Sequence, residues 1–234
     1  MNLILLNQDD FVAANSVVLS GRRFKHAQEV LKTDVGRQLT VGLVNGSMGR
    51  AEVLAKKADS LELAVALDQE PPPALALTLV LALQRPPMLK RMLFAAAMLG
   101  IKKIIILNFN RVEKSLWNSS ALKPAAIEEQ LVLGLEQAKD TVMPEVVLKK
   151  RFKPFVEDEL PALVKGRLAL VAHPGGGELP TGVIRPVILV IGPEGGILDF
   201  EIDLLESAGC RTVDLGQRIL RTESVLPLVV GKLF

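Results

Sequence analysis

The sequence contains a single cysteine, Cys210, and only two histidines, and these shortages exclude several classes of protein. One thiol cannot form a disulfide within the chain, and it cannot build a cysteine-based metal cluster. His26 and His173 do not lie at metal-ligand spacing from each other or from the cysteine, which argues against a zinc site. We therefore predict a protein of a reducing compartment, the cytoplasm, that holds no metal.

Long hydrophobic runs and a large excess of charge are also missing. Apolar runs such as residues 75–83 are far shorter than the roughly 20 residues of a membrane helix, and the first ten residues lack the basic start of a secretory signal. Lysine and arginine total 28 against 26 acidic residues, which gives a net charge of +2. We therefore predict no membrane partner, and any nucleic-acid site must be local.

Three common nucleotide-binding and hydrolase motifs do not occur in the sequence. The pattern G-x-G-x-x-G after a strand is missing, so a dinucleotide site or an ordinary Rossmann methyltransferase loop has no support. The phosphate-binding pattern G-x-x-x-x-G-K-[ST] is missing as well. Because G-x-S-x-G is also absent, a serine hydrolase of the nucleophile-elbow type is excluded.

Among the features that are present, Asp68-Gln-Glu-Pro-Pro-Pro-Ala74 divides the chain. Consecutive prolines donate no backbone hydrogen bonds and favour an extended spacer. We predict one domain over residues 1–70 and a second over residues 71–234. In the first, candidate strands flank the turn at Asn45-Gly46, and residues 60–67 alternate apolar and polar side chains. With a helix over residues 22–32, this pattern predicts a small antiparallel β domain.

Beyond the prolines, short apolar segments alternate with helical patterns, which predicts an α/β domain with a mostly parallel sheet covered on both faces. The predicted strands are residues 77–83, 104–107, 146–148, 168–172, 187–191 and 212–215. The predicted helices are residues 87–99, 124–138, 154–164, 199–208 and 222–233. The first three helices open with proline, whose missing N–H costs nothing at that position.

Three glycine-rich turns follow predicted strands, at residues 173–177, 192–196 and 216–221. In an open parallel sheet, ligands bind beyond the carboxyl ends of the strands, where glycine lets the backbone approach them closely. Each turn alone is also explained as a tight connection. The turn Gly192-Pro-Glu-Gly-Gly196 is harder to explain in that way, because it holds a carboxylate between proline and glycine directly after a buried strand. We predict that the three turns line one pocket.

Basic residues gather between positions 85 and 114, where seven cations face one acid, Glu113. A second cluster, at residues 149–153, includes Phe152, an aromatic ring that can stack on a base. A solvated face is the alternative explanation for each cluster. The low aromatic content, 4%, argues against stacking as the main mode of recognition. The candidate RNA-binding residues are Arg85, Lys90, Arg91, Lys102, Lys103, Arg111 and Lys114.

The segment Ile191-Gly-Pro-Glu-Gly-Gly196, followed by Leu215-Gly-Gln-Arg-Ile-Leu-Arg-Thr-Glu223, resembles the C-terminal signature of the bacterial 16S ribosomal RNA uracil-N3 methyltransferase family. That family belongs to the SPOUT superfamily. The resemblance extends to Leu99-Gly100-Ile101 and Glu136-Gln137 and covers most of the chain. It implies a PUA-like RNA-binding β domain, an α/β domain with a C-terminal trefoil knot, and a homodimer that pairs through the knot. The implied partner is 16S ribosomal RNA in the small ribosomal subunit.

The same resemblance implies that S-adenosylmethionine is the cofactor. Its implied binding residues are Leu170, Ala172, His173, Ile191, Gly192, Glu194, Gly195, Gly196, Leu215, Gly216, Ile219 and Leu220. Arg221 and Glu223 would lie beside the methyl acceptor, where a cation such as Arg221 can stabilise the uracil anion that develops. Glu223 would position this arginine or accept the proton. In the alternative interpretation, the two form a buried ion pair that only holds the last helix.

Several positions depart from the family pattern. Ala95 and Met98 stand where family members generally have Lys and Glu, and Asp140 stands in place of an arginine. The residues on the cofactor side are retained, whereas residues expected to face RNA have changed. The leading hypothesis is an S-adenosylmethionine-dependent methyltransferase that acts on uracil N3 in 16S ribosomal RNA. The alternatives are a SPOUT enzyme for another RNA position and a non-catalytic ribosome-assembly factor, and retention of Arg221 with Glu223 argues against the latter.

Overall fold

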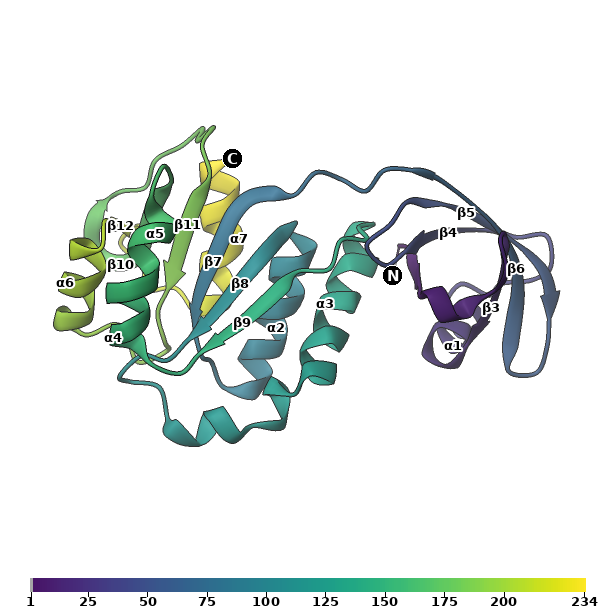
Figure 1. Ribbon diagram of the computed structural model, residues 1–234, viewed down its shortest axis with the longest axis horizontal. Helices are drawn as coiled ribbons and strands as arrows, with labels where there is room; N and C mark the ends of the chain where they lie inside the picture. The colour runs from purple at the N-terminus through teal and green to yellow at the C-terminus, as the bar shows by residue number, and fades with distance from the viewer. Residues whose placement is uncertain (1) are drawn as a thin grey trace. The chain divides into compact units, whose positions relative to one another are not determined.

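The structure, a computed structural model, describes residues 2–234, which form two compact units. Residue 1 of the first predicted domain lies outside the described residues. The first unit runs to Pro73 and also includes Val132–Met143, and the second contains Ala74–Leu131 and Pro144–Phe234. Each unit is built on a six-stranded sheet (Figure 1). Among the helices formed by residues 2–234, none is long and apolar enough to cross a membrane.

The sheet of the first unit has the strand order β1-β4-β5-β6-β3-β2. Its strands are β1 (Ile4–Leu6), β2 (Phe11–Ala13), β3 (Ser16–Ser20), β4 (Gln38–Leu43), β5 (Met48–Lys56) and β6 (Ser60–Gln69). The short helix η1 (Gln8–Asp10) precedes β2, and helix α1 (Gly21–Glu29) follows β3. Strands β4 and β5 form the hairpin predicted at Asn45-Gly46, and Asn45 adopts the left-handed conformation that such turns require, with φ of 58°.

One pairing in this sheet corrects the prediction of a purely antiparallel domain. Strand β1 pairs with β4 in parallel, whereas the other neighbouring strands are antiparallel. A parallel pair needs a long crossover connection, and β2, β3 and α1 lie between β1 and β4 in the chain. The sequence analysis did not identify β1, β2 and β3 as strands, because segments of three to five residues contain too few positions to show a period of two.

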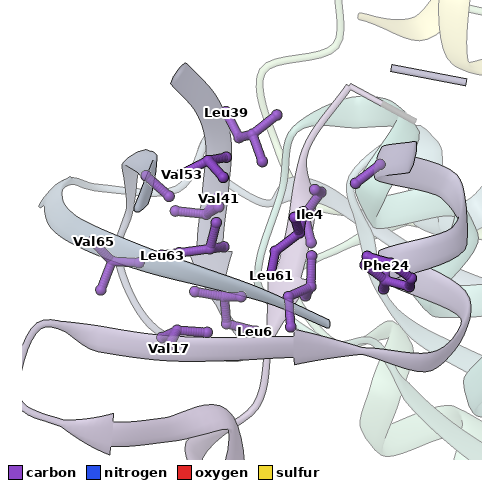
Figure 2. Packing of buried hydrophobic residues seen from close by; sticks show 13 residues of the cluster. Ile4, Leu6, Val17, Phe24, Leu39, Val41, Val53, Leu61, Leu63 and Val65 are labelled. Carbon is purple, nitrogen blue, oxygen red and sulfur yellow. The ribbon is translucent and has the colours of Figure 1, made fainter. Parts of the chain in front are cut away.

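Aliphatic side chains from five of the strands and two residues of α1 fill the interior of the first unit (Figure 2). Phe24 and Ala27 occupy the inner face of the helix, one turn apart. The buried cluster consists of Ile4, Leu6, Val17, Leu19, Phe24, Ala27, Leu39, Val41, Ala51, Val53, Leu61, Leu63 and Val65. The first unit therefore has a hydrophobic core of its own.

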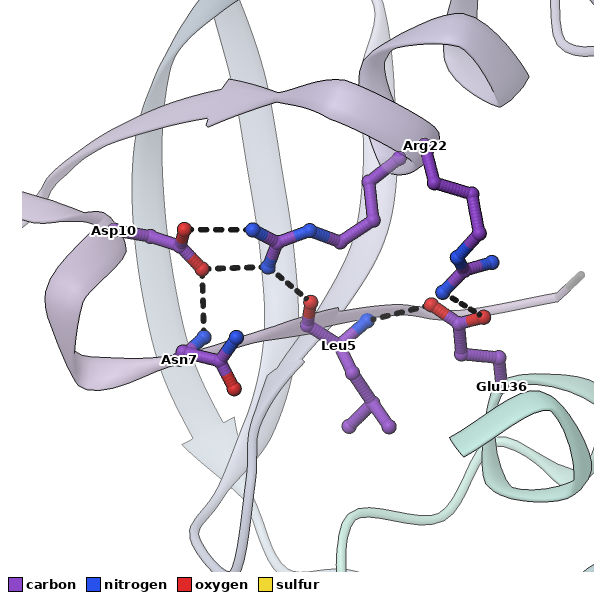
Figure 3. A network of polar contacts seen from close by, with 6 residues as sticks. Leu5, Asn7, Asp10, Arg22 and Glu136 are labelled. Carbon is purple, nitrogen blue, oxygen red and sulfur yellow. Dashed lines mark hydrogen bonds and ion pairs between the residues drawn. The ribbon is translucent and has the colours of Figure 1, made fainter. Parts of the chain in front are cut away.

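A network of polar contacts fixes the edge of this sheet (Figure 3). The guanidinium group of Arg23 donates to both carboxylate oxygens of Asp10, at 2.5 and 2.7 Å, and to the carbonyl oxygen of Leu5 at 2.8 Å. Asp10 also accepts a hydrogen bond from the backbone N–H of Asn7 at 2.6 Å. Both charged side chains are mostly buried, so the pair connects α1 to β1 and to η1 in a poorly hydrated environment.

The variant Asp10→Asn is expected to lower the free energy of unfolding by about 1–3 kcal/mol, because an amide cannot accept these three hydrogen bonds at once. Urea denaturation at neutral pH measures the change. Asp9→Asn is the matched control, since Asp9 lies on the same short helix with its side chain exposed. Equal stabilities for the two variants would contradict the role assigned to Asp10.

Glu136 adds a second connection, from helix α3 (Pro124–Ala138) to β1 (Figure 3). Its buried carboxylate accepts hydrogen bonds from Arg22 at 2.9 Å and from the backbone N–H of Leu5 at 3.5 Å. Its own carbonyl oxygen accepts from the backbone N–H groups of Asn2 and Leu3. Burial raises the pKa of the Glu136 carboxyl above its ordinary value, and the charge of Arg22 opposes this shift. The C-terminal half of α3 is thereby attached to the first sheet.

The sheet of the second unit is parallel throughout, with the order β12-β10-β11-β7-β8-β9. Its strands are β7 (Leu75–Ala82), β8 (Ile101–Leu107), β9 (Glu145–Lys149), β10 (Leu168–Glu178), β11 (Val187–Ile191) and β12 (Arg211–Asp214). The central strand β11 is buried along its whole length, as expected for a strand covered on both faces. The predicted α/β class with a mostly parallel sheet is confirmed.

Helices cover both faces of this sheet (Figure 1). They are α2 (Pro86–Met98), the first half of α3, α4 (Phe152–Pro154), η4 (Phe155–Glu159), α5 (Leu160–Val164), α6 (Asp199–Ser207) and α7 (Thr222–Leu233), with short turns η2 (Lys114–Asn118) and η3 (Ser120–Leu122). Helices α2 and α7 pack against each other, and α6 contacts η4. The predicted helix over residues 154–164 is thus a continuous helical segment with a π turn in its middle.

Two predictions about this unit are wrong. Residues 173–177 do not form a turn after a strand, because β10 continues to Glu178 and pairs with β12 on both sides of an irregularity between Ala172 and Gly177. Glycine makes this approach possible, since a Cβ on Gly176 would lie 2.6 Å from the backbone nitrogen of Val213. Phe152 is not available to stack on a base, because it is 8% exposed and packs against Phe109 with the ring centroids 4.8 Å apart.

Candidate functional site

A cavity of about 760 Å³ lies in the second unit, at the carboxyl ends of β11 and β12, beside residues 172–174 in the middle of β10, and at the start of α7. Its volume is in the range of pockets that hold small organic ligands. The predicted cofactor residues that line it are Ala172, His173, Ile191, Gly192, Glu194, Gly196, Leu215, Gly216, Ile219 and Leu220. Leu170 is instead fully buried inside β10, and Gly195 lies in the turn without lining the cavity. The structure thus brings the three glycine-rich segments together.

The turn at residues 192–196 depends on glycine at two positions. A Cβ on Gly192 would lie 2.4 Å from Cγ1 of Ile197, a buried residue of the same loop. Gly196 has φ of +80°, a left-handed conformation that residues with a Cβ rarely adopt, and its N–H donates to the carbonyl oxygen of Pro193. The turn is therefore tightly folded, and its backbone forms one wall of the cavity.

Asp214 joins the two other walls. Its carboxylate accepts hydrogen bonds from the backbone N–H of Gly175, at 3.0 Å, and from that of Gly216, at 2.8 Å. The bond from Gly175, followed by that from Gly216, holds the pKa of the Asp214 carboxyl below its ordinary value. Asp214 was not among the residues predicted from the sequence. Its position at the end of a strand, directly before Leu215-Gly216, could have indicated that it belongs to the site.

The two predicted catalytic residues occupy different environments. Arg221 immediately precedes α7 and lines the cavity, and within residues 2–234 its guanidinium group contacts no hydrogen-bond or ion-pair partner. Glu223 does not line the cavity, because its carboxylate forms an ion pair with Arg91 of α2 at 2.9 Å. The alternative interpretation, an ion pair between Arg221 and Glu223, is therefore wrong.

Two of the predicted RNA-binding residues lie against the 192–196 turn. Arg111 donates a hydrogen bond to the carbonyl oxygen of Gly195, packs its aliphatic stem on that glycine and lines the cavity. Arg85 forms an ion pair with Glu113 at 3.0 Å and approaches the carboxylate of Glu194 at 4.0 Å. These arginines thus connect the loop after β8 and the end of β7 to the cavity wall.

Two lysines of the 85–114 stretch do not lie with these arginines. Lys102 and Lys103 lie at the beginning of β8, and Lys103 pairs with Glu145 at 3.4 Å. All strands of this sheet are parallel, so the beginnings of the strands lie together at one end of the sheet. The two lysines therefore lie at the end of the sheet opposite the cavity. Lys90 and Arg91 belong to α2, and Lys114 begins η2. A run of charge in the sequence is therefore divided between two ends of the sheet.

Further cavity residues were not selected from the sequence. They are Met88, Pro174, Pro193, Ile197, Asp214, Gln217, Arg218, Thr222 and Val225. Gln217 and Arg218 lie inside the signature segment and could have been found from it. Met88 belongs to α2, far from the signature in the chain, and no local pattern marks it as part of a site.

Comparisons with known proteins agree with this architecture. The family model described as RNA methyltransferase domain matches residues 70–233. Ribosomal RNA small subunit methyltransferase E from Treponema pallidum is 31% identical over 232 residues, covering 96% of this chain and 87% of that protein. Ribosomal RNA small subunit methyltransferase E 1 from Borreliella burgdorferi is 24% identical, with coverage of 96% and 93%.

Solved structures show the same fold. A ribosomal RNA small subunit methyltransferase E from Neisseria gonorrhoeae, bound to S-adenosylmethionine, has a TM-score of 0.74 at 20% identity, covering 99% of this chain and 95% of that one. A Legionella pneumophila protein solved with bound S-adenosylmethionine has a TM-score of 0.75 at 23% identity, with coverage of 98% and 95%. From the family match and the Treponema relative, the chain belongs to the ribosomal RNA small subunit methyltransferase E family of SPOUT-type RNA methyltransferases.

Proposed function

We propose that this protein binds S-adenosylmethionine in the cavity and methylates N3 of a uracil in 16S ribosomal RNA of the small subunit. The observation that carries the proposal is the position of Arg221 at the wall of a cavity built by three glycine-rich segments, with no ion-pair partner among residues 2–234. Relatives named as small-subunit ribosomal RNA methyltransferases and structures with bound cofactor support it. Such a substrate places the protein in the cytoplasm.

The residues around the cavity fit this cofactor. Ile191, Leu215 and Leu220 offer apolar surface, and the glycines at 192, 196 and 216 leave backbone groups accessible. The carboxylates of Glu194 and Asp214 can accept hydrogen bonds from an ammonium group or from ribose hydroxyls. When bound, the cofactor supplies a methyl group that its sulfonium has already activated. The chain must then align the acceptor nitrogen and help to remove a weakly acidic proton.

We assign separate roles to Arg221 and Glu223. Arg221 stabilises the negative charge that develops on the uracil ring as the N3 proton leaves. Glu223 is engaged with Arg91, so it attaches the first turn of α7 to α2 and thereby keeps Arg221 at the cavity wall. In this assignment Arg221 is the catalytic residue and Glu223 a positioning residue.

Methyl transfer to small ribosomal subunits that lack the modification tests the proposal. Nucleoside mass spectrometry should detect 3-methyluridine only when both protein and cofactor are present. A different methylated nucleoside would instead support an enzyme for another RNA position, which the departures at Ala95, Met98 and Asp140 motivate. Cofactor binding without any methylated product would favour a non-catalytic assembly factor.

The cavity loop also carries an RNA-binding candidate. Arg218 is exposed, lines the cavity and forms no ion pair with any residue from 2 to 234. The variant Arg218→Glu is expected to weaken RNA binding about tenfold and to reduce the salt dependence by about one phosphate contact. Filter binding at several salt concentrations measures both quantities.

The sequence analysis also predicts that Lys102 and Lys103 bind RNA. Charge reversal at these two positions probes the opposite end of the sheet, independently of Arg218. Unchanged RNA affinity and salt dependence in Arg218→Glu would contradict a role for the cavity loop. The same result for the lysine variants would contradict the prediction made from the basic stretch.

We further propose that residues 1–70 form a PUA-like RNA-binding domain and that residues 71–234 carry the methyl transfer. The sheet and hydrophobic core of the first unit support a domain that folds around its own interior. Its strand β6 ends at Gln69, and three prolines follow before β7 begins. The extended connection is consistent with RNA binding by the first part and methyl transfer by the second.

We expect the protein to form a homodimer through the knotted C-terminal segment that the family resemblance implies. Helix α7 has apolar side chains outside its buried face. Leu228 and Val230 are only half-buried, and Phe234, which follows the helix, is exposed. A second subunit would cover this surface. Light scattering across a dilution series is expected to give twice the chain mass of 25.3 kDa at micromolar concentration. A value equal to the chain mass at every concentration would contradict the dimer.

A further inference from the structure

Gln84 lies two residues beyond the end of β7 and is 2% exposed. Its side-chain Nε2 donates hydrogen bonds to the carbonyl oxygen of Ala82, at 2.9 Å, and to that of Gly192, at 3.1 Å. Its Oε1 atom is buried and has no hydrogen-bond partner within residues 2–234. One end of this amide is therefore fully engaged, while the other end is left unsatisfied.

The two carbonyl groups belong to neighbouring strands. Strands β7 and β11 pair in parallel, and their last paired residues are Leu81 and Ile191. Ala82 is the last residue of β7, and Gly192 directly follows the end of β11. The side chain of Gln84 thus extends the hydrogen bonding between the strands by one step, to the point where β11 leaves the sheet and enters the 192–196 turn.

The unpaired Oε1 indicates that the amide contributes favourably through its Nε2 atom alone. A buried acceptor without a donor costs free energy, and an apolar side chain of similar size would avoid this cost. The amide nevertheless occupies the position, so its favourable contribution comes from the two donated hydrogen bonds. Because Gly192 lines the cavity, one of these bonds acts directly on the cavity wall.

We propose that Gln84 is a positioning residue for the cofactor, which fixes the carbonyl group of Gly192 and with it the turn at residues 192–196. The inference rests on the proposed function, since it assumes that this turn holds S-adenosylmethionine. Gln84 does not itself line the cavity, so it acts through the backbone of Gly192. Ile197 also lies close to Gly192, since a Cβ at this position would be 2.4 Å from Cγ1 of the isoleucine. Together they leave the first peptide of the turn in one orientation.

The variant Gln84→Met tests the inference, because methionine has a similar length but can neither donate to Gly192 nor leave an unpaired oxygen. Titration calorimetry is expected to show about tenfold weaker binding of S-adenosylmethionine. The melting temperature should stay close to that of the wild type, since the lost bonds and the removed unpaired acceptor offset each other. Gln130→Met is the matched control on helix α3, outside the cavity, and should leave affinity unchanged.

The variant Gln84→Glu gives a signature that a general loss of packing would not produce. Above the pKa of the buried glutamic acid, a carboxylate would face two carbonyl oxygens, whereas the protonated acid can donate one hydrogen bond. Cofactor affinity of this variant should therefore improve as the pH is lowered from 9 to 6. Any effect of pH on the cavity-lining groups Asp214, Glu194 and His173 is shared by Gln84→Met, so the difference between the two variants isolates position 84.

Hydrogen exchange of the unliganded protein provides a readout without cofactor. The amides of Gly192 and of residues 194–198 should exchange faster in Gln84→Met than in wild type or in Gln130→Met. The inference would be overturned if Gln84→Met bound S-adenosylmethionine as tightly as wild type and exchanged its turn amides at the wild-type rate. It would also be overturned if the cofactor affinity of Gln84→Glu were independent of pH and equal to that of Gln84→Met. If wild-type protein binds no S-adenosylmethionine, the proposed function fails instead, and faster exchange would still show that Gln84 holds the turn.

Discussion

Replacing Arg221 by alanine is expected to lower the single-turnover rate of methyl transfer about a hundredfold or more, as for loss of a contact that stabilises a developing anion. The guanidinium group lines the cavity and is not neutralised by an acid from residues 2–234. In the proposed reaction, its charge is thus available to the uracil ring as the N3 proton leaves. Because this charge develops mainly in the transition state, the affinities for cofactor and RNA should change little.

The measurement combines single-turnover methyl transfer with separate titrations of cofactor and RNA. Arg218→Ala is the matched control, since it removes an arginine from the same loop that we assign to RNA binding rather than to catalysis. Arg221→Lys should recover part of the rate, because it restores a positive charge without the planar guanidinium geometry. Near-normal turnover in Arg221→Ala would show that the catalytic role is wrong and that this arginine is structural.

Replacing Gly192 by alanine is expected to weaken binding of S-adenosylmethionine about a hundredfold or more. The added Cβ would lie 2.4 Å from Cγ1 of Ile197 and 2.9 Å from its Cδ1, so the turn or the buried isoleucine must move. Either movement displaces a wall of the cavity. Titration calorimetry measures the affinity, and thermal unfolding without cofactor shows whether the fold is retained.

Gly195→Ala is the control for this substitution. A Cβ at position 195 would meet the side chain of Arg111 at 3.4 Å, a contact that a flexible arginine can accommodate. The double variant Gly192→Ala with Ile197→Ala should regain affinity, because truncation of the isoleucine removes the overlap. If Gly192→Ala binds as tightly as Gly195→Ala, the close approach between Gly192 and Ile197 does not shape the cofactor site.

The long elements of the second unit could be predicted well from the sequence. The strand at residues 187–191 and the helices at 124–138 and 222–233 have the predicted bounds, because length and apolar content identify them locally. The bulged continuation of β10 could not be predicted in this way. Glycine and proline are typical of turns, but here the glycines let the strand lie against β12, a contact between segments far apart in the chain.

The residues of the candidate site could likewise be predicted only where they belong to one continuous segment of the sequence. The signature segments converge on one cavity as expected, since parallel strands bring their carboxyl ends to one edge of the sheet. The pairing of Glu223 with Arg91 was not predictable, because it depends on the packing of α7 against α2. For a related reason, the basic residues at positions 85–114 do not form the single patch predicted. Lys102 and Lys103 lie at the beginning of β8, which is at the end of the sheet opposite the cavity.

The strand order of the second sheet also determines the order in which the enzyme can assemble during its synthesis. Strands β7, β8 and β9 leave the ribosome first, and they can pair with one another at once. The apolar strand β7 then has an open edge until β11 emerges, and such an edge is a site for pairing with other chains. The cavity needs segments from Met88 to Val225, so a nascent chain shorter than this lacks the complete cavity in which we propose that the methyl donor binds. A protein that modifies ribosomal RNA thus becomes competent only after residue 225 has been synthesised.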